Sequence, residues 1–296
     1  MRIDQLINLL ANVTLIEMMV SVGLGAAIAD VSRVAGDGRL MLRAAIANYV
    51  CVPGICVGLL LAFARSAPDP AVFPLIAAGF LIPAVCPGAP YGPPFTAIAR
   101  GNVATAVGLM VTLAASSAIA APLLLRVLLP VVAGDAPIRI DAFKMILVLF
   151  LTQLCPLALG LGLRAWKPPM AERLKRPAGL CSMVLNLALL TLIIVAQFRM
   201  LLDIPLRAYA GMFGLVFASA AVGWLLGGRV RGERVAMTMA TAVRNVGLGL
   251  VIATTSFPGT PAIAATTAFA LFQTIVMAVV ATAWGRMATG DRGARV

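Results

Sequence analysis

Apolar residues fill most of the chain in long runs, and short polar or charged segments separate the runs. A run of about 20 apolar residues is long enough to cross a bilayer as an α-helix. The pattern predicts nine spans: Leu6–Ala29, Leu40–Ala64, Val72–Ala99, Val103–Leu129, Phe143–Leu163, Leu180–Phe198, Ala208–Gly227, Val235–Phe257 and Ala262–Trp284. We therefore expect an all-α polytopic membrane protein. Glu17 inside the first run favours a retained helix over a signal peptide.

The third run is interrupted by a segment rich in Pro and Gly, which reads CPGAPYGPPFTAIARGN from Cys86 to Asn102. Proline lacks a backbone N–H and breaks the helical hydrogen-bond ladder. Lipid offers no water to replace the lost hydrogen bonds, so such a backbone must lie against protein or a wet cavity. Broken helices of this kind form the substrate sites of many secondary carriers.

The two halves of the chain carry similar features at matching positions. The interrupted third span corresponds to the eighth, which holds the polar pair Arg244-Asn245. Corresponding spans are five crossings apart, an odd number, so they must run in opposite directions through the membrane. We predict one transmembrane domain over residues 1–287 with an inverted repeat, residues 5–131 and 141–287, and two broken helices that cross. Residues 288–296 would form a cytoplasmic tail.

Composition and charge agree with a membrane protein. Of the 296 residues 61% are hydrophobic and only 11% charged, whereas soluble domains carry about 25% charged residues. The net charge of +12 could indicate nucleic-acid binding, but the basic residues lie in short loops and form no patch with interleaved aromatics. Fifteen Lys and Arg residues lie on one set of loops and seven on the other. This bias predicts a multi-pass protein of the inner (plasma) membrane, with the N-terminus outside and the C-terminus cytoplasmic.

Two features of composition argue against an enzyme. The chain has no His, which excludes the usual zinc hydrolase motifs and imidazole-dependent nucleophiles, and its five cysteines match no zinc spacing. No Asp falls inside a predicted span, so paired intramembrane aspartates are absent as well. We expect no catalytic residues, no metal and no cofactor. The segment from Arg164 to Gly179 is expected to be a solvated loop.

The motifs resemble the bile acid:sodium symporter family and its bacterial homologues over nearly the whole chain. The specific part is Cys86-Pro87-Gly88 followed by Ala99-Arg100-Gly101-Asn102. Weaker matches are Val22-Gly23-Leu24, Asn48-Tyr49 with Pro53, and the segment Val243–Leu248. The resemblance implies a core whose two broken helices, spans three and eight, cross where they unwind. It also implies a panel of spans one, five and six, with an organic anion bound between panel and core.

The sodium sites that the resemblance implies depart from the family pattern. The first would use a Ser-Asn pair after the Cys-Pro-Gly break and hydroxyl residues on the next helix. The second would use a Glu, a Gln four residues later and an amide from the second helix. The matching positions are Gly92, Pro93, Ala106 and Met110 for the first site, and Ala240, Arg244 and Asn48 for the second. Only Asn48 offers a suitable oxygen, so a sodium cofactor is disfavoured.

Arg244 introduces a permanent positive charge where these relatives hold a removable cation. We hypothesise that its guanidinium replaces the bound sodium or binds the substrate anion. Its alternative role is a structural ion pair with Glu17, which lies deep in the first span. Glu17 is also a candidate proton carrier, with a solvated cavity wall as the alternative.

Further substrate contacts are expected around the first break. Backbone amides of Tyr91 and Gly92, with a half-helix that starts near Phe95, could hold an anionic group. Pro93 could instead only stiffen the loop. Asn48 and Asn245 should lie beside the crossing. Other polar residues in the spans are expected to form hydrogen bonds between helices: Asn102, Thr105, Thr112, Asn186 and Gln273. For Asn102, capping of the next helix is also a sufficient explanation.

The sequence thus predicts a secondary transporter of a small organic anion that works by alternating access without sodium. The alternatives are a sodium-coupled symporter with rebuilt sites and a membrane ligand sensor that does not transport. The expected partners are the substrate and the bilayer. Nothing in the sequence decides the substrate, the direction of transport, the coupling ion or whether the chain forms a homo-oligomer.

Overall fold

A computed structural model describes residues 3–64, 72–134, 140–202 and 206–293. The described chain is helical throughout and contains no β-strand. The elements are α1 Ile3–Gly25, α2 Ile28–Gly36, α3 Gly38–Ala45, η1 Ile46–Cys51, α4 Val52–Ala64, α5 Phe73–Ala84, α6 Gly92–Ile98, α7 Val103–Ala133, α8 Ala142–Leu149, η2 Phe150–Leu154, α9 Cys155–Trp166, α10 Pro168–Ala196, α11 Phe198–Leu202, α12 Leu206–Leu226, α13 Arg231–Ala242, α14 Val246–Ser256 and α15 Pro261–Gly293. The two elements named η are π-helical turns set inside longer helices.

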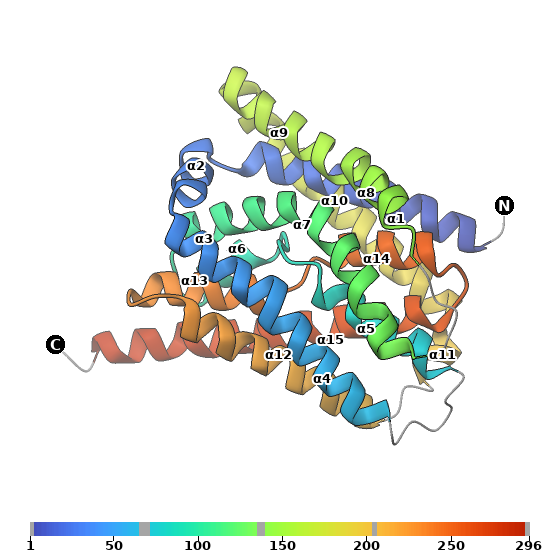
Figure 1. The fold of residues 1–296 in the computed structure, drawn as a ribbon. Helices are drawn as coiled ribbons and strands as arrows, with labels where there is room; N and C mark the ends of the chain where they lie inside the picture. The colour runs from blue at the N-terminus through green and yellow to red at the C-terminus, as the bar shows by residue number, and fades with distance from the viewer. Residues whose placement is uncertain (1–2, 65–71, 135–139, 203–205, 294–296) are drawn as a thin grey trace.

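The helices confirm the expected polytopic all-α class. Eight helical stretches of the described chain are long and apolar enough to cross a membrane, and the shorter α5 with α6 accounts for the interrupted third span. The described chain begins and ends at opposite ends of the molecule (Figure 1), as expected for an odd number of crossings. The inverted repeat and the orientation in the membrane stay predictions. Helix α15 continues as far as Gly293, into the segment predicted to be a tail.

The expected loop from Arg164 to Gly179 is wrong. Helix α9 extends to Trp166 and α10 begins at Pro168, so only Lys167 separates them. Pro168 and Pro169 lie in the first turn of α10. Proline is well tolerated there, because the first amides of a helix have no partner within the helix. The same two prolines that suggested a loop thus begin a helix, and Arg164 forms an ion pair with Glu172 across the tight turn, at 2.6 Å.

The helices form two groups. We call α1, α8–η2–α9 and α10 the panel, because α1 packs along both α9 and α10. The remaining helices, with α5, α6, α7, α13 and α14 at their centre, form the core. In Figure 1 the panel helices α1, α9 and α10 lie along one side, and α4, α12 and α15 lie along the opposite side.

Small residues let the panel helices approach closely. A Cβ atom added to Gly23 of α1 would lie 2.6 Å from the carbonyl oxygen of Leu157, and one added to Gly160 of α9 would lie 2.4 Å from that of Val20. Glycine pairs of this kind draw membrane helices together by backbone packing, since lipid supplies no hydrophobic drive between helices. This crossing fixes α1 and α9 side by side.

Candidate functional site

The first break separates α5 from α6 at residues 85–91. Helix α5 ends at Ala84, because Pro87 and Pro90 have no amides to continue the ladder and Gly88 adopts a φ of +83°. Helix α6 begins at Gly92, three residues earlier than expected, with prolines in its first turn. The carbonyls at the end of α5 are therefore without partners in their own helix.

The second break separates α13 from α14 and contains neither Pro nor Gly. Val243 is extended, with φ −93° and ψ 113°. Asn245 then caps α14, because its Oδ1 accepts a hydrogen bond from the Leu248 amide at 3.1 Å. The cap explains where α14 starts.

Gln273 of α15 holds the second break open. Its Oε1 accepts from the backbone amide of Arg244 at 3.0 Å, and its Nε2 donates to the carbonyl of the same residue at 3.0 Å. One buried side chain thereby satisfies both backbone groups of a residue that lies outside any helix. Leaving these groups without partners would be costly in a membrane interior. The hydrogen bond between helices that was expected of Gln273 is confirmed, but its partner is the peptide backbone of the break.

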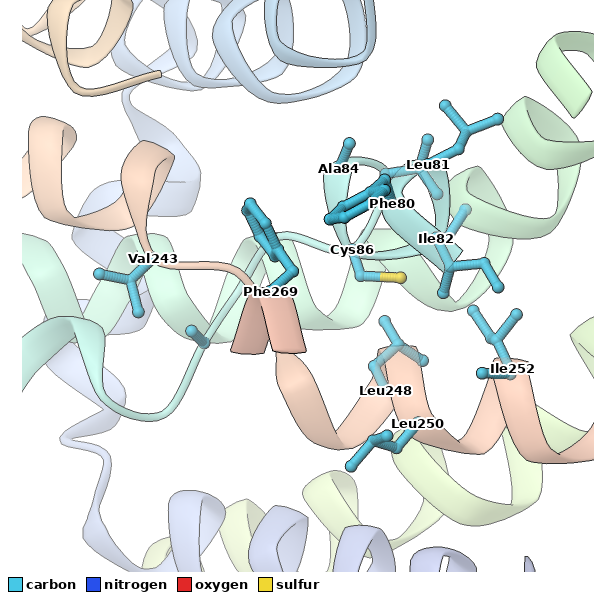
Figure 2. Close-up of a cluster of buried hydrophobic side chains, with 14 of the residues drawn as sticks. Phe80, Leu81, Ile82, Ala84, Cys86, Val243, Leu248, Leu250, Ile252 and Phe269 are labelled. Carbon is cyan, nitrogen blue, oxygen red and sulfur yellow. The ribbon is translucent and has the colours of Figure 1, made fainter. Parts of the chain in front are cut away.

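The two breaks cross and satisfy each other. The Asn245 amide donates to the carbonyl of Cys86 at 2.8 Å, and Asn245 Nδ2 donates to the carbonyl of Gly88 at 3.3 Å. Figure 2 shows the extended segment that follows Val243 passing beside the segment that carries Cys86. The rings of Phe80 and Phe269 meet edge to face beside them, 6.4 Å between centroids. The predicted crossing of two unwound segments is therefore present.

The guanidinium of Arg244 lies at this crossing, and the residue is only 1% exposed. Its four hydrogen bonds all end on neutral oxygens. Nε donates to the carbonyl of Pro83 at 3.1 Å, and Nη2 donates to that of Ala84 at 2.6 Å. Nη1 donates to Oδ1 of Asn48 at 2.7 Å and to the carbonyl of Thr241 at 3.1 Å. The arginine thus binds the last carbonyls of α5, of which that of Pro83 also accepts from the Cys86 amide at 2.9 Å.

This cage carries no compensating negative charge. Within the described residues, no carboxylate forms a hydrogen bond or ion pair with Arg244. Glu17 does not serve as its counter-ion, because Glu17 lies on α1 and accepts a hydrogen bond from Ser182 of α10. Each hydrogen bond to a charged group stabilises by about 1.5–3 kcal/mol, which offsets part of the cost of burying the cation. A net positive charge remains at the centre of the core.

Five of the positions that the resemblance assigns to the two sodium sites are buried and carry apolar residues. Ala240 joins a buried cluster with Leu109, Leu113 and Met237. Ala106 and Met110 are buried on α7, and Gly92 and Pro93 are buried in the first turn of α6. None of these five side chains carries an oxygen, so they cannot supply the hard ligands that sodium requires.

The predicted side chains Arg244, Asn48, Asn245, Tyr91 and Glu17 lie in three different places. Arg244, Asn48 and Asn245 lie together inside the core, and each is at most 1% exposed. Tyr91 lies apart, at the interface between core and panel, where its hydroxyl accepts a hydrogen bond from Asn186 of α10 at 2.8 Å. Glu17 lies within the panel, next to Ser182.

Sequence reasoning missed the residues whose role depends on the crossing. Thr241 and Pro83 contribute backbone carbonyls, which no side-chain pattern marks. Gln153 was not singled out, although it is a fully buried amide in the fifth span. Its glutamine side chain in an apolar run was the only available signal.

Comparison with known proteins agrees with this architecture. The model of a family described as the sodium bile acid symporter family matches residues 12–204, which is 193 of the 296 residues and more than half of the chain. No curated protein matches the chain. Two broken helices that cross within a bundle of membrane-length helices, together with this match, show that the chain belongs to the sodium bile acid symporter family.

Proposed function

We propose that the protein is a secondary transporter that moves a small organic anion by alternating access and does not depend on sodium. The name of its family joins sodium with bile acid, an organic anion, which supports the substrate class. The panel and core would move against each other, and the anion would occupy the interface between them. The Lys and Arg bias of the loops favours an N-terminus outside and a C-terminus in the cytoplasm.

The observation that carries this proposal is the fixed, unpaired positive charge of Arg244. At a separation of about 4 Å and an effective dielectric near 20, a second cation would be repelled by about 4 kcal/mol. That repulsion weakens sodium binding by about a thousandfold. The carbonyls and the Asn48 oxygen that could coordinate a cation already accept hydrogen bonds from the guanidinium.

The geometry favours replacement of the ion over direct contact with the substrate. The four hydrogen bonds of Arg244 all stay inside the core, and the side chain is almost fully buried. Its charge would act on the anion through space, where the interior of low dielectric keeps the attraction strong. Glu17, hydrogen-bonded to Ser182 within the panel, could still carry a proton, and that role remains a prediction.

Flux in proteoliposomes tests the proposal. Purified protein would be reconstituted and uptake of labelled carboxylates measured in sodium chloride and in choline chloride of equal ionic strength. We expect equal initial rates in the two salts. Uptake that occurs only in sodium would contradict ion replacement and favour a sodium-coupled symporter, whereas binding without uptake would favour a sensor.

A double substitution provides the matched test of the ion site. Arg244→Gln with Ala240→Glu removes the fixed charge and adds a carboxylate one helical turn away. We expect sodium chloride, but not choline chloride, to raise the thermal midpoint of this variant, since a ligand that binds only the folded state stabilises it. The unmodified protein should respond equally to both salts. A sodium response of equal size in both proteins would refute the proposed role of Arg244.

A further inference from the structure

Two π-helical turns aim polar side chains at the same turn of α7. Tyr49 of η1 lies 2.7 Å from the hydroxyl of Ser116 and donates to the carbonyl of Leu113 at 3.2 Å. Gln153 of η2 donates through Nε2 to the carbonyl of Ala114 and to the hydroxyl of Ser117 at 3.1 Å. π-Turns are frequent at functional sites, because the extra residue re-aims the side chains around it.

The turn of α7 that receives these side chains lies next to the first break. A Cβ atom added to Gly88 would lie only 2.3 Å from the backbone nitrogen of Ala114. Gln153, by contrast, belongs to the panel. Its amide therefore crosses the interface between panel and core beside the broken helix, where the proposed function places the anion.

The amide of Gln153 is only half satisfied. Its Nε2 has two acceptors, but its Oε1 has no hydrogen-bond partner among the described residues, and the side chain is 0% exposed. A buried acceptor without a partner costs about 1–3 kcal/mol. Such groups are rare in folded proteins, and each calls for an explanation.

A second unpartnered oxygen lies on the neighbouring panel helix. The hydroxyl of Thr14 in α1 is fully buried and has no partner among the described residues. Helices α1 and α8–α9 run in the same direction (Figure 1), and Gly23 packs against Gly160. Thr14 lies nine residues before Gly23, and Leu151 of η2 lies nine residues before Gly160. Helix α1 also contacts η2. Thr14 is therefore level with the π-turn that carries Gln153.

Other polar side chains of the central panel already have partners. Glu17 accepts from Ser182, and Asn186 donates to Tyr91. Thr152, next to Gln153, donates to the carbonyl of Val148 in its own helix at 2.8 Å. A third such oxygen, that of Gln197, lies beyond the last residue of α10. The unused capacity of the described central panel is therefore the Gln153 carbonyl, which needs a donor, and the Thr14 hydroxyl, which can accept from one.

We propose that Gln153 and Thr14 form a subsite on the panel that accepts a hydrogen bond from an O–H or N–H group of the transported anion. The subsite rests on the proposed function, because the ligand reaches these atoms only when the panel and core separate. The positive charge of the core attracts the carboxylate of the ligand, and the panel accepts a hydrogen bond from its donor group. A ligand without a donor would leave Oε1 of Gln153 unpaired and bind more weakly.

Matched pairs of carboxylates that differ by one hydroxyl group test the subsite. The pairs are propionate with lactate, butyrate with 3-hydroxybutyrate, and phenylacetate with mandelate. Binding to the purified full-length protein would be measured by thermal shift in choline chloride. For the pair that binds most tightly, we expect the hydroxylated member to bind about ten- to a hundredfold more tightly, the value of one buried hydrogen-bonding group.

Substitutions then assign the preference to residues. Gln153→Met keeps the length of the side chain and removes the carbonyl, so it should reduce the preference to less than about threefold, and Thr14→Val should reduce it in part. Thr152→Val on the same π-turn is the control and should leave the preference intact.

The possible failures can be told apart. Equal binding of both members of every pair by the unmodified protein would overturn the subsite and leave the proposed transporter standing. A Gln153→Met variant that weakens both members equally would mean that Gln153 only braces the two domains, which also overturns the subsite. Binding of no carboxylate in any pair would count against the proposed function and against the subsite with it.

Discussion

At the scale of single residues, Asn48 offers a direct way to cancel the charge of Arg244. Its Oδ1 accepts from the guanidinium at 2.7 Å, so Asn48→Asp would place a carboxylate against the cation. At about 8 Å and a dielectric near 20, loss of one positive charge removes about 2 kcal/mol of attraction for an anion. We expect the affinity for the anion, measured by uptake at varied substrate concentration, to fall by about thirtyfold.

The control for that variant is Asn12→Asp, which adds the same charge to α1. Among the described residues, the Asn12 side chain bonds to Asn8 of the same helix and not to the Arg244 cage. Equal losses of affinity in the two variants would show that a negative charge anywhere in a span is harmful, and would remove the support for a special role of Arg244.

Gln273 provides a second prediction at the residue scale, which concerns stability. Gln273→Met fills the same space but leaves the amide and the carbonyl of Arg244 without partners, at a cost of about 1–3 kcal/mol for each group. The thermal midpoint in detergent should fall markedly. Thr274→Val, which removes a hydroxyl bonded only within its own helix, should fall far less. A similar midpoint for both variants would mean that the break does not need Gln273.

At the scale of helices, the contact between α1 and α9 depends on glycine at one position and not at its neighbour. Gly160→Ala would place a Cβ atom 2.4 Å from a backbone oxygen of α1, whereas Gly162→Ala meets nothing within 4 Å. Forcing the helices apart should cost about 1–3 kcal/mol. Gly162→Ala should be neutral, or stabilise by up to about 1 kcal/mol through helix propensity. Thermal midpoints of the two proteins check this, and the reverse order would contradict the packing.

The two broken helices show what local sequence can and cannot predict. The first break was predictable, because Pro87, Gly88 and Pro90 leave an apolar helix no way to continue. The second break has no such signal. It persists because Gln273 of α15 and the Cys86 carbonyl of the first break satisfy its backbone, and because Asn245 within the break caps α14. The resemblance to a family indicated its position, but the local residues alone would have predicted an unbroken span.

The prolines at the start of α10 show the opposite error. Pro168 and Pro169 suggest a loop because proline ends helices, yet the first turn of a helix accepts them. The cage around Arg244 escaped prediction for a different reason. Three of its four acceptors are backbone carbonyls, which every residue carries, so only their spatial arrangement identifies them.

At the scale of the whole molecule, alternating access requires the panel and core to move apart. Asn8 of α1 and Thr255 of α14 lie across their interface, with 3.4 Å between Nδ2 and Oγ1. In a background without accessible cysteines, Asn8→Cys with Thr255→Cys joined by a short cleavable thiol cross-linker should abolish uptake. Cleavage of the linker should restore it, because the rigid bodies can then separate.

The control joins two helices of the core. Leu59→Cys with Gly214→Cys links α4 to α12, where a Cβ atom on Gly214 would lie 3.8 Å from Leu59. Since both helices move together, uptake should persist after cross-linking. Uptake that survives the Asn8–Thr255 link would count against movement between the two groups of helices.

The crossing also bears on how the chain is made. The carbonyls of Ala84 and Gly88 accept hydrogen bonds from side chains 160 and 157 residues further along the sequence. The ribosome synthesises those residues long after the third span. Until then the polar backbone of the first break has no hydrogen-bond partners from the second half, and lipid cannot solvate it. We therefore expect that segment to insert fully only after the second half has been synthesised. A fragment that stops before Arg231 should be recognised by cellular quality control as incompletely folded.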